Sequence, residues 1–147
     1  MIDPFNLQRF VDAQASVYRQ ACAELRAGRK ATHWMWFVFP QIAGLGTSTM
    51  ARLYAIGSAA EARAYLAHPL LGARLRECTA LVLAIEGRTA HEIFRDPDDL
   101  KFRSSMTLFA AVADDAAIFD QALQKYFAGA GDPRTHEILA NNEVMRR

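Results

Sequence analysis

Apolar residues recur every three to four positions along most of the chain, and prolines and glycines interrupt this pattern before any segment becomes long. Such spacing places the apolar side chains on one face of an amphipathic helix. No segment shows the sustained alternation that a half-buried strand requires. Val38 and its aromatic neighbours could form one strand, which would have no partner. We therefore predict an all-α fold, a compact, multihelical single domain of residues 1–147 with short, proline-punctuated helices.

The expected helix boundaries follow from capping residues and glycines. Four helix starts carry a capping side chain, at Asp3, Ser58, Thr89 and Asp132. Three helices are expected to end at Gly28, Gly87 and Gly129. The first helix should run without a break to Gly28, and the last should end at about Ala140, with a frayed tail over residues 141–147. A short helix or extended stretch followed by a loop is expected within residues 31–46.

The charge balance excludes some classes of function. The 147 residues carry a formal net charge of +1 at pH 7. A dedicated nucleic-acid binder would have a basic surface, so neither DNA nor RNA is expected as the main partner. The N-terminal MIDPFNLQRF lacks the apolar core of a signal peptide, and no apolar run is long enough to cross a bilayer. We expect a cytoplasmic protein with no membrane partner.

Residues that commonly bind metals are scattered along the chain. Cys22 and Cys78 each lie within an apolar helical pattern, where a thiol packs as a small hydrophobe. The histidines show neither zinc-binding spacing nor a neighbouring nucleophile motif, and they lie at positions 33, 68, 91 and 136. The sequence predicts no metal site and no cofactor, and it assigns no catalytic residue.

The first candidate site is segment 33–41, which contains both tryptophans. Apolar walls with a few polar groups are typical of small-molecule pockets. The candidate ligand-binding residues are His33, Trp34, Trp36, Phe37 and Gln41. On a helix, Trp34 would point away from the other rings, so some of these rings must belong to the core. A core role for the whole segment is the alternative, because large aromatic side chains dominate core packing.

The second candidate site is LKFRSSMTLF, residues 100–109. Its cations and hydroxyls could hold a phosphate or a carboxylate, and they belong to Lys101, Arg103, Ser104, Ser105 and Thr107. The alternative is a solvated helix face with capping hydroxyls.

Two loops add weaker candidates. Gly44-Leu45-Gly46 would let the backbone approach a ligand closely, and Asp132 after Gly129-Ala130-Gly131 is expected to cap the last helix.

Four segments resemble a known family, namely DPFNLQRFVDAQ, HWMWFVFPQIAGLG, LKFRSSMTLF and ALQKYFAGAGDPRTHEIL. They are similar to the bacterial domain-of-unknown-function family numbered eighteen-ten, over about residues 2–140. The resemblance implies an all-helical bacterial protein and assigns no activity. Some members carry the label calpastatin, the name of a eukaryotic calpain inhibitor. Calpastatins are disordered and acidic and this chain is neither, which makes calpain inhibition a remote alternative.

A more distant similarity links this chain to the YbiA-like, or NADAR, proteins. It rests on residues 65–77 and on the stretch LF…FDQALQKYFAG, which are similar to the later helices of that family. The resemblance implies ADP-ribose and N-glycosidic chemistry. The acidic and aromatic motifs that define the NADAR site do not align with this chain, so no catalytic residue is carried over.

Two functions from different classes remain. The first is binding of a nucleotide- or ADP-ribose-like ligand, with a flat base stacked on the aromatic segment and phosphates held by Lys101, Arg103 and Ser104. Whether the chain is an enzyme stays open, and N-glycosidic hydrolysis of an ADP-ribose-type substrate is the reaction that this hypothesis favours. The second is a non-enzymatic interaction domain, in which exposed aromatic residues form a partner surface or a homodimer interface.

Overall fold

The computed structural model describes residues 2–145, with side chains described through residue 142. The described chain forms ten α-helices and no strand, which confirms the predicted all-α fold. The helices are α1 (Gln8–Ala15), α2 (Tyr18–Arg26), α3 (Met35–Val38), α4 (Thr49–Leu53), α5 (Ala59–Ala67), α6 (Leu71–Leu83), α7 (Ala90–Phe94), α8 (Asp98–Val112), α9 (Ala117–Phe127) and α10 (Pro133–Met145). None of these helices combines the length and the apolar character needed to cross a membrane.

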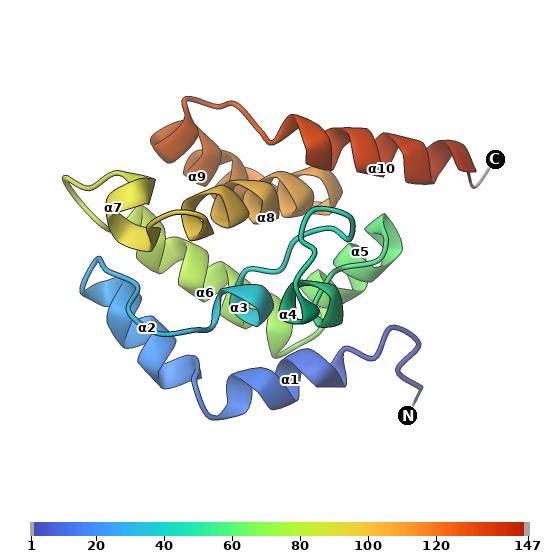
Figure 1. Ribbon diagram of the computed structural model, residues 1–147, viewed down its shortest axis with the longest axis horizontal. Helices are drawn as coiled ribbons and strands as arrows, with labels where there is room; N and C mark the ends of the chain where they lie inside the picture. The colour runs from blue at the N-terminus through green and yellow to red at the C-terminus, as the bar shows by residue number, and fades with distance from the viewer. Residues whose placement is uncertain (1, 146–147) are drawn as a thin grey trace.

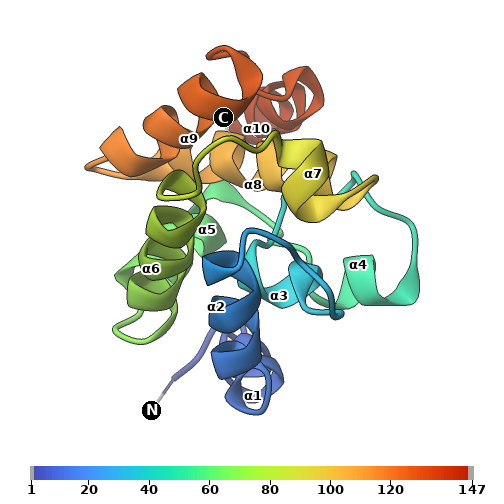
Figure 2. The same cartoon turned by 90° about the vertical axis from the view of Figure 1, so that its left-hand side faces the viewer.

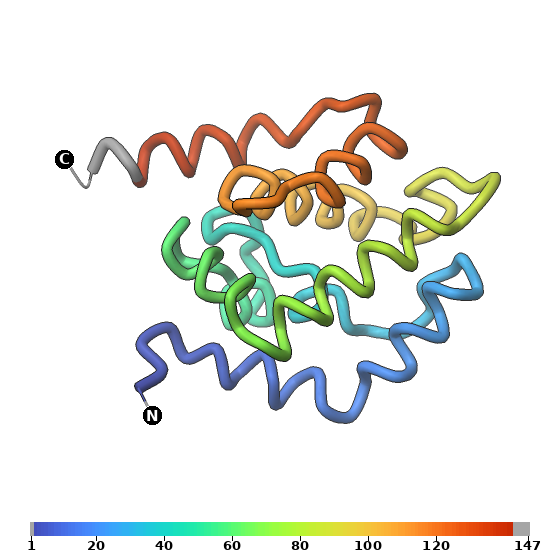
Figure 3. Tube along the Cα trace, turned by 180° about the vertical axis from the view of Figure 1, so that it is seen from behind, coloured from blue at the N-terminus to red at the C-terminus, as the bar shows by residue number. Residues whose placement is uncertain are grey.

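Helices α6 and α8 form the centre of the molecule (Figure 1). α8 packs against α5, α7, α9 and α10, while α6 packs against α2, α3, α5 and α9. From behind, α6 crosses the molecule between α2 and α9 (Figure 3). α1 and α2 lie on one side of this centre, and α10 lies on the other side along α8 (Figure 1).

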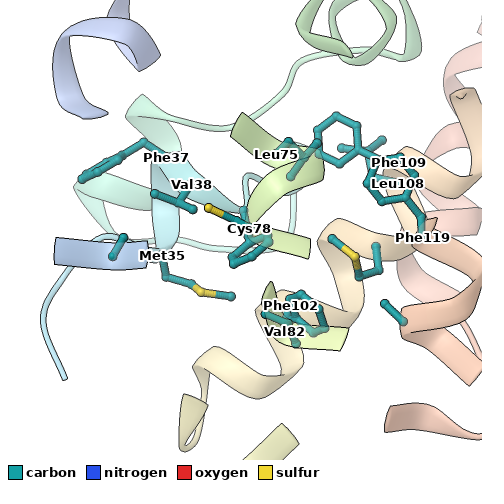
Figure 4. Close-up of a cluster of buried hydrophobic side chains, with 14 of the residues drawn as sticks. Met35, Phe37, Val38, Leu75, Cys78, Val82, Phe102, Leu108, Phe109 and Phe119 are labelled. Carbon is teal, nitrogen blue, oxygen red and sulfur yellow. The ribbon is translucent and has the colours of Figure 1, made fainter. Parts of the chain in front are cut away.

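A continuous apolar core joins α3, α6, α8 and α9, as Figure 4 shows. Phe102 of α8 occupies its middle, with its ring centroid 5.0 Å from that of Phe39 and 4.8 Å from that of Phe94. Cys22 and Cys78 are buried free thiols, as predicted. Burial of many aromatic side chains provides most of the driving force for folding, at about 25 cal/mol per Å² of apolar surface.

The capping residues act largely as predicted. The Ser58 hydroxyl accepts a hydrogen bond from the Glu61 amide at 3.1 Å, and Thr89 and Glu92 form a complete, reciprocal capping box. The predicted terminal glycines adopt left-handed backbone conformations, with φ of 76° at Gly28, 73° at Gly87 and 80° at Gly129. Such conformations favour glycine because it has no Cβ.

Two helix boundaries were predicted wrongly. The first predicted helix is interrupted at Ser16 and Val17, and α1 begins only at Gln8, after a turn in which the Asp3 carboxylate accepts hydrogen bonds from two backbone amides. The break lets α1 pack on α3 while α2 packs on α6, which one straight helix could not do. The last helix continues to Met145 instead of ending near Ala140. Residues 146 and 147 of the predicted frayed tail lie outside the described residues.

Candidate functional site

The aromatic segment 33–41 divides between the core and the surface. Trp34 precedes the four-residue helix α3 and is fully buried. Its indole Nε1 donates a hydrogen bond to Oε1 of Glu24 at 2.9 Å. Phe37 is also buried, and its backbone carbonyl accepts a hydrogen bond from Gln14 Nε2 at 2.7 Å. These two rings pack in the interior, where a ligand cannot reach them without opening the fold.

Glu24 holds the chain that leads into α3. Besides the Trp34 indole, its carboxylate accepts hydrogen bonds from the backbone amides of Ala31 and Thr32 at 2.7 and 2.9 Å. Burial by itself would raise the pKa of Glu24. The hydrogen bonds from Thr32, Ala31 and Trp34 outweigh burial and lower this pKa from 4.5 to about 2. The group is therefore an ionised structural anchor at neutral pH.

Trp36 points to the surface and lies near two other predicted site residues. The exposed His33 ring stacks beside it, with centroids 6.4 Å apart and an interplanar angle of 28°. The Lys101 ammonium lies 5.5 Å from the Trp36 ring centroid. That ammonium also lies 3.5 Å from Asp98, which pairs with Lys30 at 2.9 Å. A half-buried aromatic face beside a cation is thus available at the surface.

A small slot opens beside Trp36. It has a volume of about 10 Å³, and its walls are Met35, Trp36, Phe39, Gln41, Ala51, Tyr54 and Lys101. A cavity of this size has room for roughly one water molecule. The slot combines apolar and aromatic walls with the amide of Gln41 and the ammonium of Lys101. Three predicted site residues from two distant segments therefore meet in one place.

One wall of the slot, formed by Ala51 and Tyr54, belongs to residues 43–55, which we call the 43–55 loop. Two backbone hydrogen bonds close its ends, from Ala43 N to Ile56 O at 2.8 Å and from Ile56 N to Gln41 O at 2.9 Å. They form an isolated parallel bridge between Ile42 and Ile56, a pairing that the sequence did not reveal. Figure 2 shows this loop, with α4, standing out from the body of the protein at the right. A compact surface loop with adjacent ends is an Ω-loop.

One end of the 43–55 loop is held more firmly than the other. Arg9 donates hydrogen bonds to the carbonyls of Leu53 and Ala55, each at 2.9 Å. Helix α4 contributes no buried residue. Gly44 has a φ of 105°, a backbone conformation that permits a sharp change of direction. Before Arg52 the loop is held by the partly buried side chains of Leu45 and Met50, which pack against the core.

A second cleft adjoins the slot under the same loop. It has a volume of about 200 Å³ and shares Gln41 and Ala51 with the slot. Its remaining walls are Ile42, Ala43, Gly44, Gly46, Arg52 and Ala55. The predicted glycine loop thus lines a cleft next to Trp36, with one exposed arginine at its edge.

Three residues of the second predicted motif lie elsewhere and tie α8 to the start of α10. Arg103 donates hydrogen bonds to the carbonyls of Ala130 and Gly131, both at 2.9 Å. The Ser104 hydroxyl bonds Asp132 at 2.9 Å, and the Thr107 hydroxyl accepts from the Asp132 amide at 2.8 Å. The polar groups of these three side chains therefore form hydrogen bonds within the protein.

Asp132 caps α10, which confirms the predicted cap. Its carboxylate accepts from the Thr135 amide at 3.3 Å and from the Thr135 hydroxyl at 2.6 Å. Burial by itself would raise the pKa of Asp132, but the hydrogen bonds from Thr135 and Ser104 outweigh it, so the pKa is lowered. The cap is ionised at neutral pH and stabilises the positive end of the helix dipole.

Ser105 differs from its neighbours. It is fully buried, and its Oγ is the only buried side-chain polar atom without a hydrogen-bond partner among the described residues. It follows Lys101 by one helical turn and therefore lies on the same face of α8. Such orphan hydroxyls in folded proteins usually have a water or a ligand as partner.

Another groove lies where no site was predicted. It has a volume of about 460 Å³ and lies between α5, α8 and α10. Its walls are Ala59, Arg63, Ala111, Val112, His136, Leu139, Ala140 and Asn142. These residues come from three separate helices and form no local motif, which is why sequence reasoning missed them. Among the described residues, no three His, Cys, Asp or Glu side chains are arranged to hold a metal ion.

Comparison with known proteins places this geometry in a family. The crystal structure of a conserved hypothetical protein of Mycobacterium tuberculosis, Rv1873, is similar to this chain with a TM-score of 0.93. The two chains are 59% identical, and the match covers 94% of this chain and 99% of the other. A search of the curated proteins found no match. The model of a family described as "Protein of unknown function (DUF1810)" matches residues 4–139. The chain therefore belongs to the DUF1810 family, as its sequence motifs predicted.

Proposed function

We propose that this protein binds a flat, negatively charged small ligand of the nucleotide or ADP-ribose type beneath the 43–55 loop. One observation carries the proposal: Trp36, Gln41 and Lys101 line a single aromatic-walled slot. An aromatic face, an amide and a cation are the groups that recognise a base and a phosphate.

Each group around the slot has a definable role. The Trp36 ring stacks the base, a contact worth about 1–3 kcal/mol per base. The side-chain amide of Gln41 supplies one hydrogen-bond donor and one acceptor for the edge of the base. Lys101 leaves Asp98 to pair with the phosphate, while Asp98 keeps its ion pair with Lys30. Arg52 and the backbone around Gly44 and Gly46 line the adjoining cleft, where a second phosphate would lie.

The 43–55 loop must open to admit the ligand, because the slot now has room for about one water molecule. A Cβ placed at Gly46 would lie 2.5 Å from Cβ of Ala51, so the loop packs closely onto α4. The bridge between Ile42 and Ile56 and the bonds of Arg9 to Leu53 and Ala55 stay in place while residues 44–51 lift. Binding then closes the loop over the ligand.

Hydrolysis of an N-glycosidic bond extends this proposal and is the chemistry that the similarity to NADAR proteins suggests. The walls of the slot include no carboxylate. Asp98, which contacts Lys101, is the acidic group that would assist such a reaction. Release of nicotinamide or a free base from ADP-ribose-type substrates, measured by chromatography, tests the extension apart from binding.

Titration calorimetry of the full chain with AMP, ADP and ADP-ribose tests binding. We expect Trp36→Ala to weaken binding roughly five- to a hundredfold, the loss of one stacking contact. Lys101→Met should weaken binding of ADP and leave binding of adenosine unchanged. Arg134→Met is the matched control, because this arginine is exposed and pairs with the exposed Glu137. Hydrogen exchange of residues 43–53 should slow when ligand is bound.

The proposal fails if no compound of this panel binds at millimolar concentration. It also fails if Trp36→Ala binds as tightly as the parent protein.

The alternative function, a homodimer interface, has one specific observation in its favour. Leu53 on α4 and Leu100 on α8 are large exposed apolar side chains, 52% and 53% accessible, on two of the helices that border the slot. Light scattering over a range of concentrations tests it. A dimer that Leu100→Glu dissociates would support this function, whereas a monomer at every concentration would contradict it.

A further inference from the structure

The groove between α5, α8 and α10 is independent of the slot beside Trp36. α5 and α10 both pack on α8 (Figure 1). Residues of all three helices line the groove, which has a volume of about 460 Å³. Small-molecule sites commonly have volumes of roughly 300–1,000 Å³. The slot and the groove share no residue, so a ligand in one leaves the other free.

The groove continues into a second lobe. This lobe has a volume of about 300 Å³, and Arg63 and Val112 line both lobes. The second lobe is completed by Leu66, Ala67, Arg76, Ala113 and Asp114. A single ligand can therefore extend from one lobe into the other past Arg63.

The two lobes differ in character. The larger lobe has alanines on all three helices and Val112 and Leu139 as its larger apolar walls, and Arg63, His136 and Asn142 complete it. The smaller lobe holds two guanidinium groups, from Arg63 and Arg76, against the single carboxylate of Asp114. Apolar walls in one lobe beside an excess of positive charge in the other are complementary to a molecule with an apolar body and an anionic end.

Arg63 is the group best placed to bind an anion. It is exposed, and it forms no ion pair with any side chain that the structure describes. Arg76 is already held in place, with its guanidinium 3.3 Å from the Asp115 carbonyl and 5.1 Å from the Phe119 ring centroid. A fixed guanidinium beside one that is unpaired among the described side chains provides a preorganised site for a carboxylate.

We propose that the groove binds an amphipathic carboxylate. Its carboxylate lies between Arg63 and Arg76 in the smaller lobe, and its apolar chain lies against Val112 and Leu139 in the larger lobe. The alanines at positions 59, 111 and 140 allow the chain to approach the helices closely.

Titration of the ¹⁵N-labelled full chain with decanoate, below its micellar range, tests this site. Amide shifts should concentrate on residues that line the two lobes. Arg63→Gln should weaken decanoate binding about tenfold, the value of one charge-assisted hydrogen bond, and leave binding of the neutral decanol unchanged. Ala140→Trp fills the larger lobe from an exposed position and should weaken binding of both compounds.

Two controls separate this site from other surfaces. Arg134→Gln removes an exposed cation from the same helix as Leu139 and should leave decanoate binding unchanged. Trp36→Ala should also leave it unchanged, which distinguishes failure of this inference from failure of the nucleotide proposal. Decanoate shifts outside the groove, or equal decanoate affinity of Arg63→Gln and the parent protein, would overturn the inference.

Discussion

The indole of Trp34 donates a hydrogen bond of 2.9 Å to the carboxylate of Glu24, and both side chains are buried. The same carboxylate accepts hydrogen bonds from the backbone amides of Ala31 and Thr32. One acidic side chain of α2 thus fixes the four residues that lead into α3. Since Trp36 follows two positions after Trp34, this anchor also sets the orientation of the half-buried Trp36 ring.

Replacing Glu24 by glutamine should destabilise the protein strongly. A neutral amide has one acceptor oxygen where the carboxylate uses two, so several buried donors lose their partner or gain a competing donor. We expect a loss of about 3 kcal/mol in the free energy of unfolding, measured in urea. Glu137→Gln, which removes an exposed pair with Arg134, is the control and should cost less than about 0.5 kcal/mol. Equal effects of the two variants would contradict the anchoring role.

The protein should lose stability in acid because the Glu24 carboxylate becomes protonated. Its pKa is lowered in the folded state from 4.5 to about 2, so the folded form binds a proton less readily than the unfolded form. The stabilisation is therefore complete above pH 4.5 and is lost as the pH falls toward 2. The difference corresponds to about 3 kcal/mol. Urea unfolding from pH 6 to pH 2.5 should show a shallower decline in Glu24→Gln, and parallel curves would argue against this assignment.

Arg103→Met should loosen the start of α10. It removes two hydrogen bonds to the carbonyls of Ala130 and Gly131. We expect a loss of about 1–2 kcal/mol and faster hydrogen exchange over residues 129–142. Affinity for nucleotides should not change, because Arg103 lies outside the slot. A variant of unchanged stability that had lost nucleotide binding would assign Arg103 to the ligand site instead.

Ser105→Ala and Ser104→Ala should differ in their effects on the stability of the protein. The Ser105 hydroxyl is buried without a partner, so its removal should leave stability unchanged or raise it by up to about 1 kcal/mol. The Ser104 hydroxyl bonds Asp132, and its removal should cost about 1 kcal/mol. Thermal unfolding distinguishes the two. A marked loss in Ser105→Ala would show that a bound water satisfies this hydroxyl.

Local signals in the sequence were sufficient for most helix ends. The Thr89 capping box and the left-handed Gly129 depend on residues close in the chain, and both were predicted correctly. The break at Ser16 and Val17 was missed because it depends on tertiary packing: α1 contacts α3, and α2 contacts α6. The pairing of Ile42 with Ile56 was missed for the same reason, since it joins two segments that carry no strand pattern.

The candidate site was predictable only in part. Residue types indicated where a site could form, and Trp36, Gln41 and Lys101 do meet. Composition could not distinguish Trp34 from Trp36, because their roles depend on where the short helix α3 begins. Nor could it show that Arg103 and Ser104 bond to the segment before α10, some 27 and 28 positions further along the chain.

The two ends of the 43–55 loop lie side by side, so the number of residues between them can vary while the rest of the fold stays the same. Because the backbone hydrogen bonds of Ile56 to Gln41 and Ala43 complete the base of the loop, residues can be inserted beyond them without stretching the interior. Related chains can therefore differ in this segment while keeping the same helical scaffold. Under the proposed function, grafting the segment between homologues should transfer ligand preference with it.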